Sequence, residues 1–384
     1  MVEILKTKFH DKFGQDPAFI VRAPGRINLI GEHTDYNKGF VFPAAINAYI
    51  YLAFVALPKS SNVSRVAAYD LVDEASIDLS NLKRTDKTWL NYLLGILDQF
   101  DKQGTKLLNF QCLIMGDLPI GSGMSSSSAL DVGFALGMNH INDLGLSKLD
   151  LAYLSQKANH EFQGVKGGIM DQYSILFGKR NKAMLLDCRS LEASFHSCEL
   201  KNYEWVLINS MVTHDNSLTA YNRRVEECTS AINKISSHNE IQYDSLRNLS
   251  LPQLNESRFL LTEIEFQRAS FVLKENARVH KFAEALKNNE AKKLGKLLYE
   301  SHRGLRDEYE VSCTELDLIV ELTYKEEAIL GSRMMGGGFG GCTINLVEKG
   351  TRSIVEKICS SYEKETKFRP EAYFIEITDG AIIL

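Results

Sequence analysis

Hydrophobic positions along the chain follow the spacings of both strands and helices. The stretch 45–57 is rich in Tyr, Ile, Phe and Val, and Phe110–Met115 is a second apolar run bounded by turn residues, so both predict buried strands. Behind a serine cluster, apolar residues from Leu130 to Ile141 recur at helical spacing. Strand and helix patterns mix along the whole chain without internal repeats, which indicates an α/β or α+β protein.

Capping signals and helical faces locate the remaining expected elements. Ser147 and Asp150 can cap a helix over 151–160. In the second half we expect a helix along 218–232, a helical region over 276–302, a helix from Ser312 to Ile329 opened by a capping box, and a strand over Cys342–Val347. We place a domain boundary near residue 200, which divides the chain into residues 1–200 and 201–384.

Charge and composition narrow the class of protein. The 44 Lys and Arg against 49 Asp and Glu give a net charge of −5 without long runs of one sign, which argues against a nucleic-acid or membrane-surface partner. The longest apolar run ends at Pro58 and is too short to span a bilayer, and charged residues interrupt any apolar segment near the start. Seven cysteines without a C-x-x-C pair indicate reduced thiols. We therefore expect a cytoplasmic protein.

Two glycine-containing segments are candidates for ligand binding. Gly121–Ser128 lies between a predicted strand and a predicted helix, where backbone amides can approach a phosphate, although the spacing is not that of the Walker motif. The alternative is a plain turn with a serine cap. Gly336–Gly341 precedes an apolar strand, so its glycines can serve unusual dihedrals or close packing against a ligand or the first loop. A purely structural bend is the alternative.

The densest cluster of charged and polar residues lies between Arg22 and Tyr36. Carboxylates and an imidazole at Glu32, His33 and Asp35 can bind the hydroxyls of a polyol, with a solvated loop as the alternative interpretation. Further along, Asp171 precedes an amphipathic run, and local sequence alone favours a helix cap at this position.

Taken together, these segments resemble the galactokinases, members of the GHMP family of small-molecule kinases. Arg26–Asn37 is similar to the galactokinase signature, Pro119–Ala129 to the phosphate loop of the family, and Met334–Cys342 to its third motif. The resemblance runs from about residue 20 onward. It implies a two-lobed α+β fold, with an N-terminal lobe like a ribosomal-protein domain, a C-terminal ferredoxin-like lobe and the active site in the cleft.

The resemblance also implies roles for individual residues. Arg26 and Asp171 match the catalytic pair. The matching sugar-binding residues are Glu32, His33, Asp35, Gly168 and Tyr221. The residues that match the ATP site are Gly121, Ser122, Gly123, Met124, Ser125, Ser126, Ser127 and Ser128 in the phosphate loop, with Trp89 and Tyr92 against the adenine. The implied reaction is attack of galactose O1 on the γ-phosphorus of ATP, with Asp171 as proton acceptor.

One position departs from the family pattern in a way that bears on Mg²⁺. Ser127 and Asn159 match the metal positions, but galactokinases usually carry a glutamate where this chain has Asn159, and an amide is a weaker ligand. Either Ser127, water and ATP hold the ion, or Glu161 substitutes, or activity is compromised. The alternatives to a galactokinase are therefore a silent sugar sensor on the same fold and an N-acetylgalactosamine kinase. A monomer that binds galactose and ATP is expected.

Overall fold

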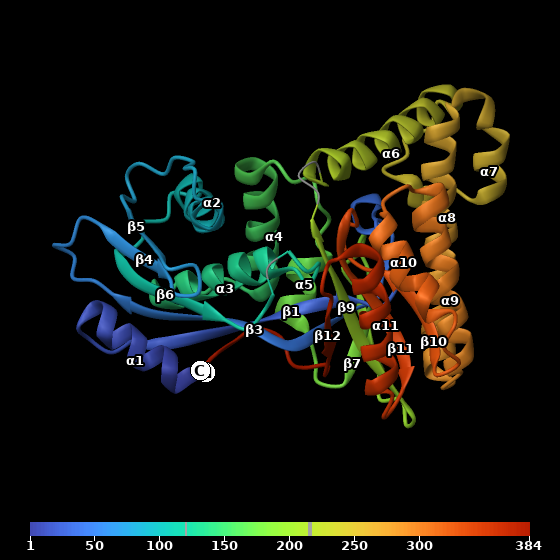
Figure 1. The fold of residues 1–384 in the computed structure, drawn as a ribbon. Coiled ribbons are helices and arrows are strands. Elements are labelled where there is room, and N and C mark those ends of the chain that lie inside the picture. Colours follow the sequence, from blue (N-terminus) through green and yellow to red (C-terminus); the bar gives the residue numbers. More distant parts are fainter. Residues whose placement is uncertain (120, 214–216) are drawn as a thin grey trace.

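The computed structural model describes residues 1–119, 121–213 and 217–384, and these form two lobes that lie side by side (Figure 1). The first lobe is built on a six-stranded sheet. In spatial order its strands are β13 (Ile382–Ile383), β1 (Phe19–Asn28), β3 (Pro43–Ala56), β6 (Phe110–Gly116), β4 (Ser64–Ala68) and β5 (Asp73–Ile77). All neighbours are antiparallel except β4 and β6.

Helices cover both faces of this sheet because its strands are apolar on both sides. One face carries α2 (Thr88–Lys102), α3 (Ser126–Ile141), α4 (Lys148–Ala158) and α5 (Met170–Phe177) (Figure 1). The other face carries α1 (Val2–Phe13), whose Leu5 and Phe9 are buried against Ile20 and Leu113. A small sheet, formed by β2 (Phe40–Val41), β7 (Lys182–Asp187) and β8 (Ala193–Ser197), follows the first.

The second lobe is a four-stranded antiparallel sheet with helices on it. Its strands, in spatial order, are β10 (Ile329–Met334), β11 (Gly340–Glu348), β9 (Tyr203–Thr213) and β12 (Glu371–Phe374). Its helices are α8 (Glu263–Lys287), α9 (Ala291–Arg303), α10 (Thr314–Thr323) and α11 (Arg352–Thr366), and α6 (Ser217–Asn239) and α7 (Leu251–Glu256) pack on α8 at one end (Figure 1). Two short π-helical turns, Asn159–Gln163 and Gly304–Glu308, follow α4 and α9.

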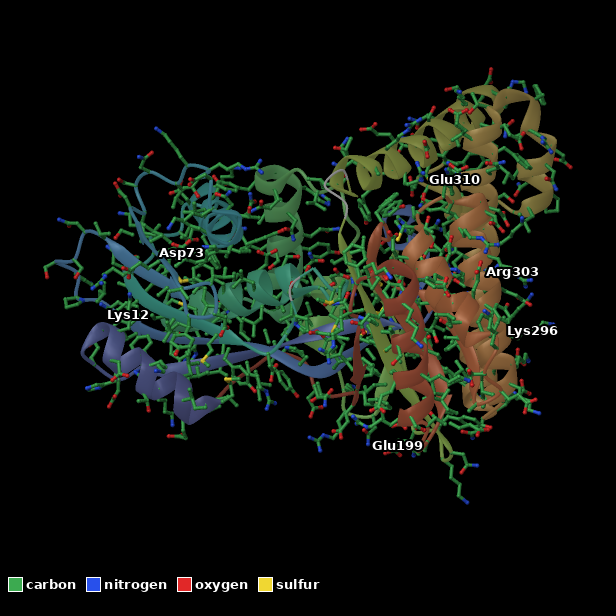
Figure 2. All side chains as sticks on the ribbon, viewed as in Figure 1. Lys12, Asp73, Glu199, Lys296, Arg303 and Glu310 are labelled. Atoms are coloured by element: carbon green, nitrogen blue, oxygen red, sulfur yellow. The ribbon has the colours of Figure 1, made fainter. Side chains whose placement is uncertain are left out.

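The mixed sheets and helices confirm the expected α+β class. The stretch 45–57 lies in β3 except for Leu57, Phe110–Met115 lies in β6, and Ser147 and Asp150 form the expected capping box of α4. Charged side chains, for example Lys12 and Lys296, are spread over the outside of both lobes (Figure 2). Among the described residues no helix has the length and apolar character that crossing a bilayer requires. The division at residue 200 stays a prediction.

One expected helical region is confirmed and one expected helix is wrong in extent. The region 276–302 is helical, formed by the end of α8 and most of α9, and Asn289 adopts a left-handed conformation with φ of 55° between the two helices. Asparagine tolerates this conformation better than most residues. The helix expected from Ser312 to Ile329 spans only Thr314–Thr323, and the hydroxyl of Ser312 donates to Asp317 instead of capping the backbone.

Gly295 allows α9 to lie directly on β10. A Cβ atom at this position would overlap the carbonyl oxygen of Leu330. We therefore expect Gly295→Ala to lower the free energy of unfolding by about 1–3 kcal/mol, the usual cost of overpacking, although alanine favours helices. Urea unfolding followed by circular dichroism measures this. Lys292→Ala on the exposed side of the same helix should change the free energy of unfolding little. An equal loss of stability in both variants would contradict the close contact between Gly295 and Leu330.

Candidate active site

Two adjoining cavities lie where the three sequence motifs meet. The smaller, about 180 Å³, has a polar lining that includes Arg26, Asp35 and Asp171. The larger, about 620 Å³, has a more apolar lining that includes Trp89 and several residues of Gly121–Ser128, the serine-rich loop. Arg26, Tyr92, Ser127 and Gly337 line both cavities, so a group bound at the junction would be in reach of both spaces.

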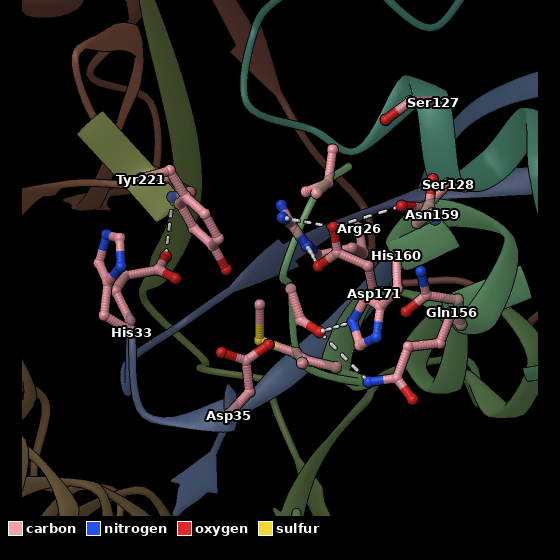
Figure 3. Close-up of a pocket in the computed structure, with 18 of the residues that line it drawn as sticks. Arg26, His33, Asp35, Ser127, Ser128, Gln156, Asn159, His160, Asp171 and Tyr221 are labelled. Carbon is pink, nitrogen blue, oxygen red and sulfur yellow. Dashed lines mark hydrogen bonds and ion pairs between the residues drawn. The ribbon is translucent and has the colours of Figure 1, made fainter. Parts of the chain in front are cut away.

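An ion pair between Arg26 and Asp171 stands at this junction (Figure 3). Arg26 Nε donates to Asp171 Oδ1 at 2.6 Å, Nη2 donates to Oδ2 at 3.1 Å, and Nη1 donates to the carbonyl of Gly123 at 2.6 Å. Burial disfavours the charge on Arg26, but the carboxylates of Asp171, Glu32 and Asp35 outweigh it and raise its pKa. Arg26 therefore stays charged, and its hydrogen bond to Gly123 holds the serine-rich loop in place.

Asp171 does not cap a helix, as local sequence alone would favour. The N-cap of α5 is Ile169, and Asp171 is the second helical residue. Its Oδ2 accepts the hydroxyl of Ser125 at 2.5 Å, and Ser128 lies at 3.5 Å. Ser125 is the N-cap residue of α3 in a left-handed conformation with φ of 59°, and its side chain leaves the first amides of α3 uncapped. Those amides can therefore bind an anion.

Glu32 is buried, so the solvated-loop interpretation of this segment is wrong for it. Its Oε1 accepts both terminal nitrogens of Arg333 at 3.1 Å and the backbone N–H of Gly336 at 2.9 Å, while its Oε2 accepts the amide of Asn28 at 3.1 Å. Glu32 lines the smaller cavity, yet its oxygens are already bound by protein groups. The main effect of Glu32 in this geometry is to join the first motif, Arg26–Asn37, to the third motif, Met334–Cys342.

Asp35, in contrast, forms no ion pair within the described part of the chain. Burial and the negative charge of Asp171 raise the pKa of Asp35 to about 7, although a backbone hydrogen bond at Tyr36 opposes the shift. Gly168 makes room for this side chain, because a Cβ atom on Gly168 would overlap the Asp35 carboxylate. Both residues line the smaller cavity, so the carboxyl group of Asp35 is available to a ligand there.

His33 and Tyr221 form the opposite side of the smaller cavity (Figure 3). Their ring centroids lie 5.4 Å apart. Burial, together with the positive charges of Arg224 and Arg333, lowers the pKa of His33 to about 3, while a backbone interaction with Gly337 opposes this. The imidazole is therefore neutral at physiological pH. Its Nε2 has no hydrogen-bond partner of normal geometry among the described residues.

The larger cavity holds most of the residues expected to bind the nucleotide. Those that line it are Trp89, Tyr92, Gly121, Gly123, Ser125, Ser126 and Ser127, and Ser128 lines the smaller cavity. Ser122 and Met124 are buried beneath the loop and line neither, with the hydroxyl of Ser122 donating to the carbonyl of Pro119. Ile120, within the Pro119–Ala129 motif, lies outside the described residues.

The glycine segment of the third motif, Gly336–Gly341, packs directly on the serine-rich loop Gly121–Ser128. A Cβ atom on Gly336 would approach the carbonyl of Gly123 to 3.3 Å, and one on Gly341 would approach the carbonyl carbon of Ser122 to 3.2 Å. Both glycines have positive φ values, 83° and 80°, which L side chains rarely adopt. This confirms the expected close packing against the first loop, and the segment is not a simple bend.

Oxygen donors for a divalent cation lie at the edge of the smaller cavity. Ser127 and Asn159 line it, and Asp131, one helical turn after Ser127, is buried with both carboxylate oxygens lacking normal hydrogen-bond partners. Burial raises the pKa of Asp131 well above its ordinary value, and the Asn159 amide offsets this only in part. No group of three His, Cys, Asp or Glu residues suited to a metal was found in the part of the chain that the structure describes.

Glu161 lies outside this cavity and is engaged elsewhere. Its carboxylate accepts Lys102 at 2.8 Å and Gln99 at 3.0 Å on the surface of the first lobe. These hydrogen bonds lower the pKa of Glu161 to about 2. The geometry therefore gives no support to Glu161 as the substitute for a glutamate at position 159.

Sequence reasoning missed several residues of the site. Arg333, the partner of Glu32, lies in an ordinary apolar strand and carries no local motif. Gln156 and His160, which also line the smaller cavity, contact the carbonyl of Gly167 at 3.2 and 2.7 Å. Their spacing of four residues on consecutive helical turns was the one available signal.

Comparisons with known proteins give a consistent result. Three family models match the chain: the galactokinase galactose-binding signature over residues 7–55, the GHMP kinases N terminal domain over 91–179 and the GHMP kinases C terminal domain over 282–364. The chain is 39% identical to the galactokinase of Thermosipho africanus over 361 residues, which cover 94% of this chain and 98% of that one. It is 36% identical to the galactokinase of Clostridium acetobutylicum over 391 residues, with coverage of 99% and 98%.

Solved structures show the same architecture. The crystal structure of Lactococcus lactis galactokinase complexed with galactose matches with a TM-score of 0.93 and 32% identity over 99% of both chains. A mevalonate kinase structure matches with a TM-score of 0.63 at 18% identity, over 94% of this chain and 99% of that one, which shows a shared fold. Together these matches confirm the two-lobed GHMP kinase fold.

The raised pKa of Asp35 makes stability depend on pH. Unfolding restores its ordinary pKa of 3.8, so between about pH 4 and pH 7 the unfolded state binds fewer protons and stability falls as pH rises. Asp35→Asn removes this loss. We expect the variant to gain about 1–3 kcal/mol over the natural chain between pH 4 and pH 8 in urea unfolding. For the surface variant Asp101→Asn, the stability relative to the natural chain should not change with pH. If the stability of Asp35→Asn relative to the natural chain were also independent of pH, the raised pKa would be contradicted.

Proposed function

The chain belongs to the galactokinase family of GHMP kinases, and from this we propose that it transfers the γ-phosphoryl group of ATP to O1 of galactose, giving α-D-galactose 1-phosphate. The observation that carries this proposal is the Arg26–Asp171 ion pair at the junction of a polar and a more apolar cavity. A phosphoryl donor and a hydroxyl acceptor bound in the two cavities would meet at this pair.

Galactose is proposed to occupy the smaller cavity. Among the described residues Asp35 forms no ion pair and Nε2 of His33 has no hydrogen-bond partner, so both can bind sugar hydroxyls. Tyr221 and Gly168 bound the same space. Glu32 mainly holds the wall of this cavity in place, because its oxygens are bound to Arg333, Asn28 and Gly336.

ATP, the phosphoryl donor of this kinase family, is proposed to occupy the larger cavity. Trp89 and Tyr92 offer aromatic faces for the adenine, and the indole of Trp89 is fixed by donating to Asp73 at 2.8 Å. The loop from Gly121 to Ser128 and the uncapped amides of α3 suit the phosphates. This arrangement directs the terminal phosphate toward Arg26.

In the proposed reaction, the O1 oxygen of galactose forms a bond to the γ-phosphorus while the bond from that phosphorus to the bridging oxygen of ADP breaks. The O1 proton passes to Asp171, and ADP leaves with the electron pair of the broken bond. Arg26 orients Asp171 through two hydrogen bonds and stabilises negative charge on the transferring group. Positioning in two fixed cavities supplies the remainder of the acceleration.

Mg²⁺ is proposed to bind beside Ser127 and Asn159. Their hydroxyl and amide oxygens are the hard donors that this ion prefers, and the buried oxygens of Asp131 place a carboxyl group behind them. When bound, the ion would neutralise charge on the phosphates. A monomeric state and a cytoplasmic location stay predictions from the sequence.

A catalytically silent sugar sensor is favoured only by the replacement at Asn159. The intact Arg26–Asp171 pair supports the enzyme. The decisive experiment incubates the purified chain with ATP, Mg²⁺ and galactose and identifies the product by phosphorus NMR. A phosphate on the anomeric carbon in the α configuration is expected; phosphate on another carbon, or no sugar phosphate, would refute the proposal. Adding N-acetylgalactosamine as a competing substrate tests whether the chain is instead an N-acetylgalactosamine kinase.

Asp171→Asn should retain the fold and lower kcat by about 10²–10⁴-fold, because an amide cannot accept the O1 proton. Steady-state kinetics measures the loss, and a single cooperative thermal unfolding transition shows that the variant is folded. Asp101→Asn serves as the control with normal turnover. Near-normal kcat in Asp171→Asn would remove Asp171 from the role of base.

Asn159→Glu should lower the Mg²⁺ concentration for half-maximal rate by about tenfold and leave galactose affinity unchanged, because the added charge faces the metal. Mg²⁺ titrations of rate and calorimetry with galactose measure the two quantities. Glu161→Gln is the control, since Glu161 lies outside the cavity. If Glu161→Gln raised the Mg²⁺ demand instead, the proposed metal position would be wrong.

A further inference from the structure

Three of the proposed sugar-binding residues lie in one segment, Gly31–Phe40, which we call the sugar loop. They are Glu32, His33 and Asp35. The second lobe holds this loop at both of its ends. At the start, the backbone N–H of Gly31 donates to Oε1 of Glu275 at 3.1 Å. At the end, the backbone N–H of Phe40 donates to Oδ1 of Asn276 at 2.9 Å.

Glu275 and Asn276 are adjacent residues of α8, the long helix of the second lobe (Figure 1), and both are buried. Oε1 of Glu275 also accepts the hydroxyl of Ser301 at 2.7 Å, and its Oε2 accepts Nη1 of Arg278. A buried carboxylate needs such partners for its charge. Because Ser301 and Arg278 belong to α9 and α8, the second lobe itself fixes this carboxylate, which does not rely on the sugar loop for its position.

The sugar loop approaches α8 so closely that side chains would not fit at its first and ninth residues. A Cβ atom on Gly31 would lie 2.8 Å from Cγ2 of Val279, and one on Gly39 would overlap Oδ1 of Asn276. Val279 is one helical turn beyond Glu275, so these contacts come from one face of α8. The backbone of the loop is therefore held directly against this face at both ends.

A buried threonine closes the sugar loop between its two ends. The hydroxyl of Thr34 lies 2.8 Å from the carbonyl oxygen of Gly31 and 2.6 Å from that of Phe40. Within the loop, the amide of Asn37 donates to the carbonyl of His33 at 3.0 Å. These bonds make the loop a compact unit, so a displacement of its ends also displaces the residues between them.

We propose that Glu275 and Asn276 are positioning residues for the sugar, because by holding both ends of the sugar loop they place His33 and Asp35 against the ligand. Neither Glu275 nor Asn276 lines the smaller cavity, so they act without touching the sugar. The proposal rests on the proposed function, since it takes galactose to lie in that cavity. It makes galactose affinity depend on a helix of the second lobe, whereas Trp89 and the serine-rich loop of the ATP site belong to the first lobe.

Hydrogen exchange of the ligand-free chain, followed by mass spectrometry of its peptides, tests the loop contact without any substrate. Glu275→Met keeps the length of the side chain but removes the acceptor of the Gly31 N–H. We expect the peptide 29–41 to exchange about tenfold faster in this variant, because the loop opens more often. Glu275→Gln keeps an acceptor oxygen and should exchange nearly as the natural chain does. Unchanged exchange in Glu275→Met would overturn the proposal.

Steady-state kinetics tests the consequence for the sugar. Glu275→Met should raise the KM for galactose about tenfold and leave the KM for ATP and kcat within about twofold of the natural values. The matched control is Glu265→Met. Glu265 is also buried in α8, and its carboxylate accepts a backbone N–H, a hydroxyl and an ammonium group from Thr262, Ser230 and Lys234, which all lie outside the sugar loop. This control should lower the unfolding temperature but leave both KM values unchanged.

If Glu275→Met does not fold, Asn276→Leu takes its place. Leucine has a similar volume but no acceptor for the Phe40 N–H, so the same faster exchange and the same rise in the galactose KM are expected. An equal rise of the ATP and galactose KM values, or the same change in Glu265→Met, would overturn the proposal. If loop exchange responds as expected but the natural chain does not bind galactose, the proposed function fails while the contact between α8 and the sugar loop is retained.

Discussion

The shape of the cleft depends on one buried carboxylate. Glu32 is 1% exposed and is shared by Arg333 of β10, Asn28 of β1 and the backbone of Gly336. Removing one partner of such a pair typically costs about 3–5 kcal/mol, because the other charge is left buried. Through this carboxylate the third glycine segment is fixed against the first motif. The serine-rich loop, which packs on that segment, takes its position in consequence.

The distribution of counter-ions explains why neighbouring carboxylates behave differently. Glu32 pairs with Arg333 and Asp171 pairs with Arg26, whereas Asp35 shares the same space without an ion-pair partner among the residues that the structure describes. The unpaired carboxyl group is therefore the one whose protonation is open to change and whose oxygens are open to a ligand. The neutral ring of His33 beside it adds no competing charge.

Local sequence patterns predicted the elements that depend on neighbouring residues. All but the last residue of the apolar stretch 45–57 lies in β3, the capping box at Ser147 opens α4, and the glycine segment before β11 packs on the loop Gly121–Ser128 as expected. The family resemblance brought Arg26 and Asp171 together although they lie far apart in sequence. Neither could reveal that Arg333 would pair with Glu32, because a buried ion pair between distant strands leaves no periodic signal. The expected helix end at Ile329 was wrong, because the helix that follows Ser312 already ends at Thr323.

The edge strand β13 has a consequence for synthesis of the chain. Ile382 and Ile383 pair with β1, and the backbone amides of Ala381 and Leu384 donate to Ile175 and Ile20. The outermost strand of the first sheet is thus supplied by residues that are synthesised after the helices and strands of the second lobe. Domains generally fold from the N-terminus as they emerge, but this lobe keeps an open sheet edge until the second lobe has been synthesised. An unpaired edge is a surface on which other chains can add, so during that interval the nascent first lobe is most in need of a chaperone.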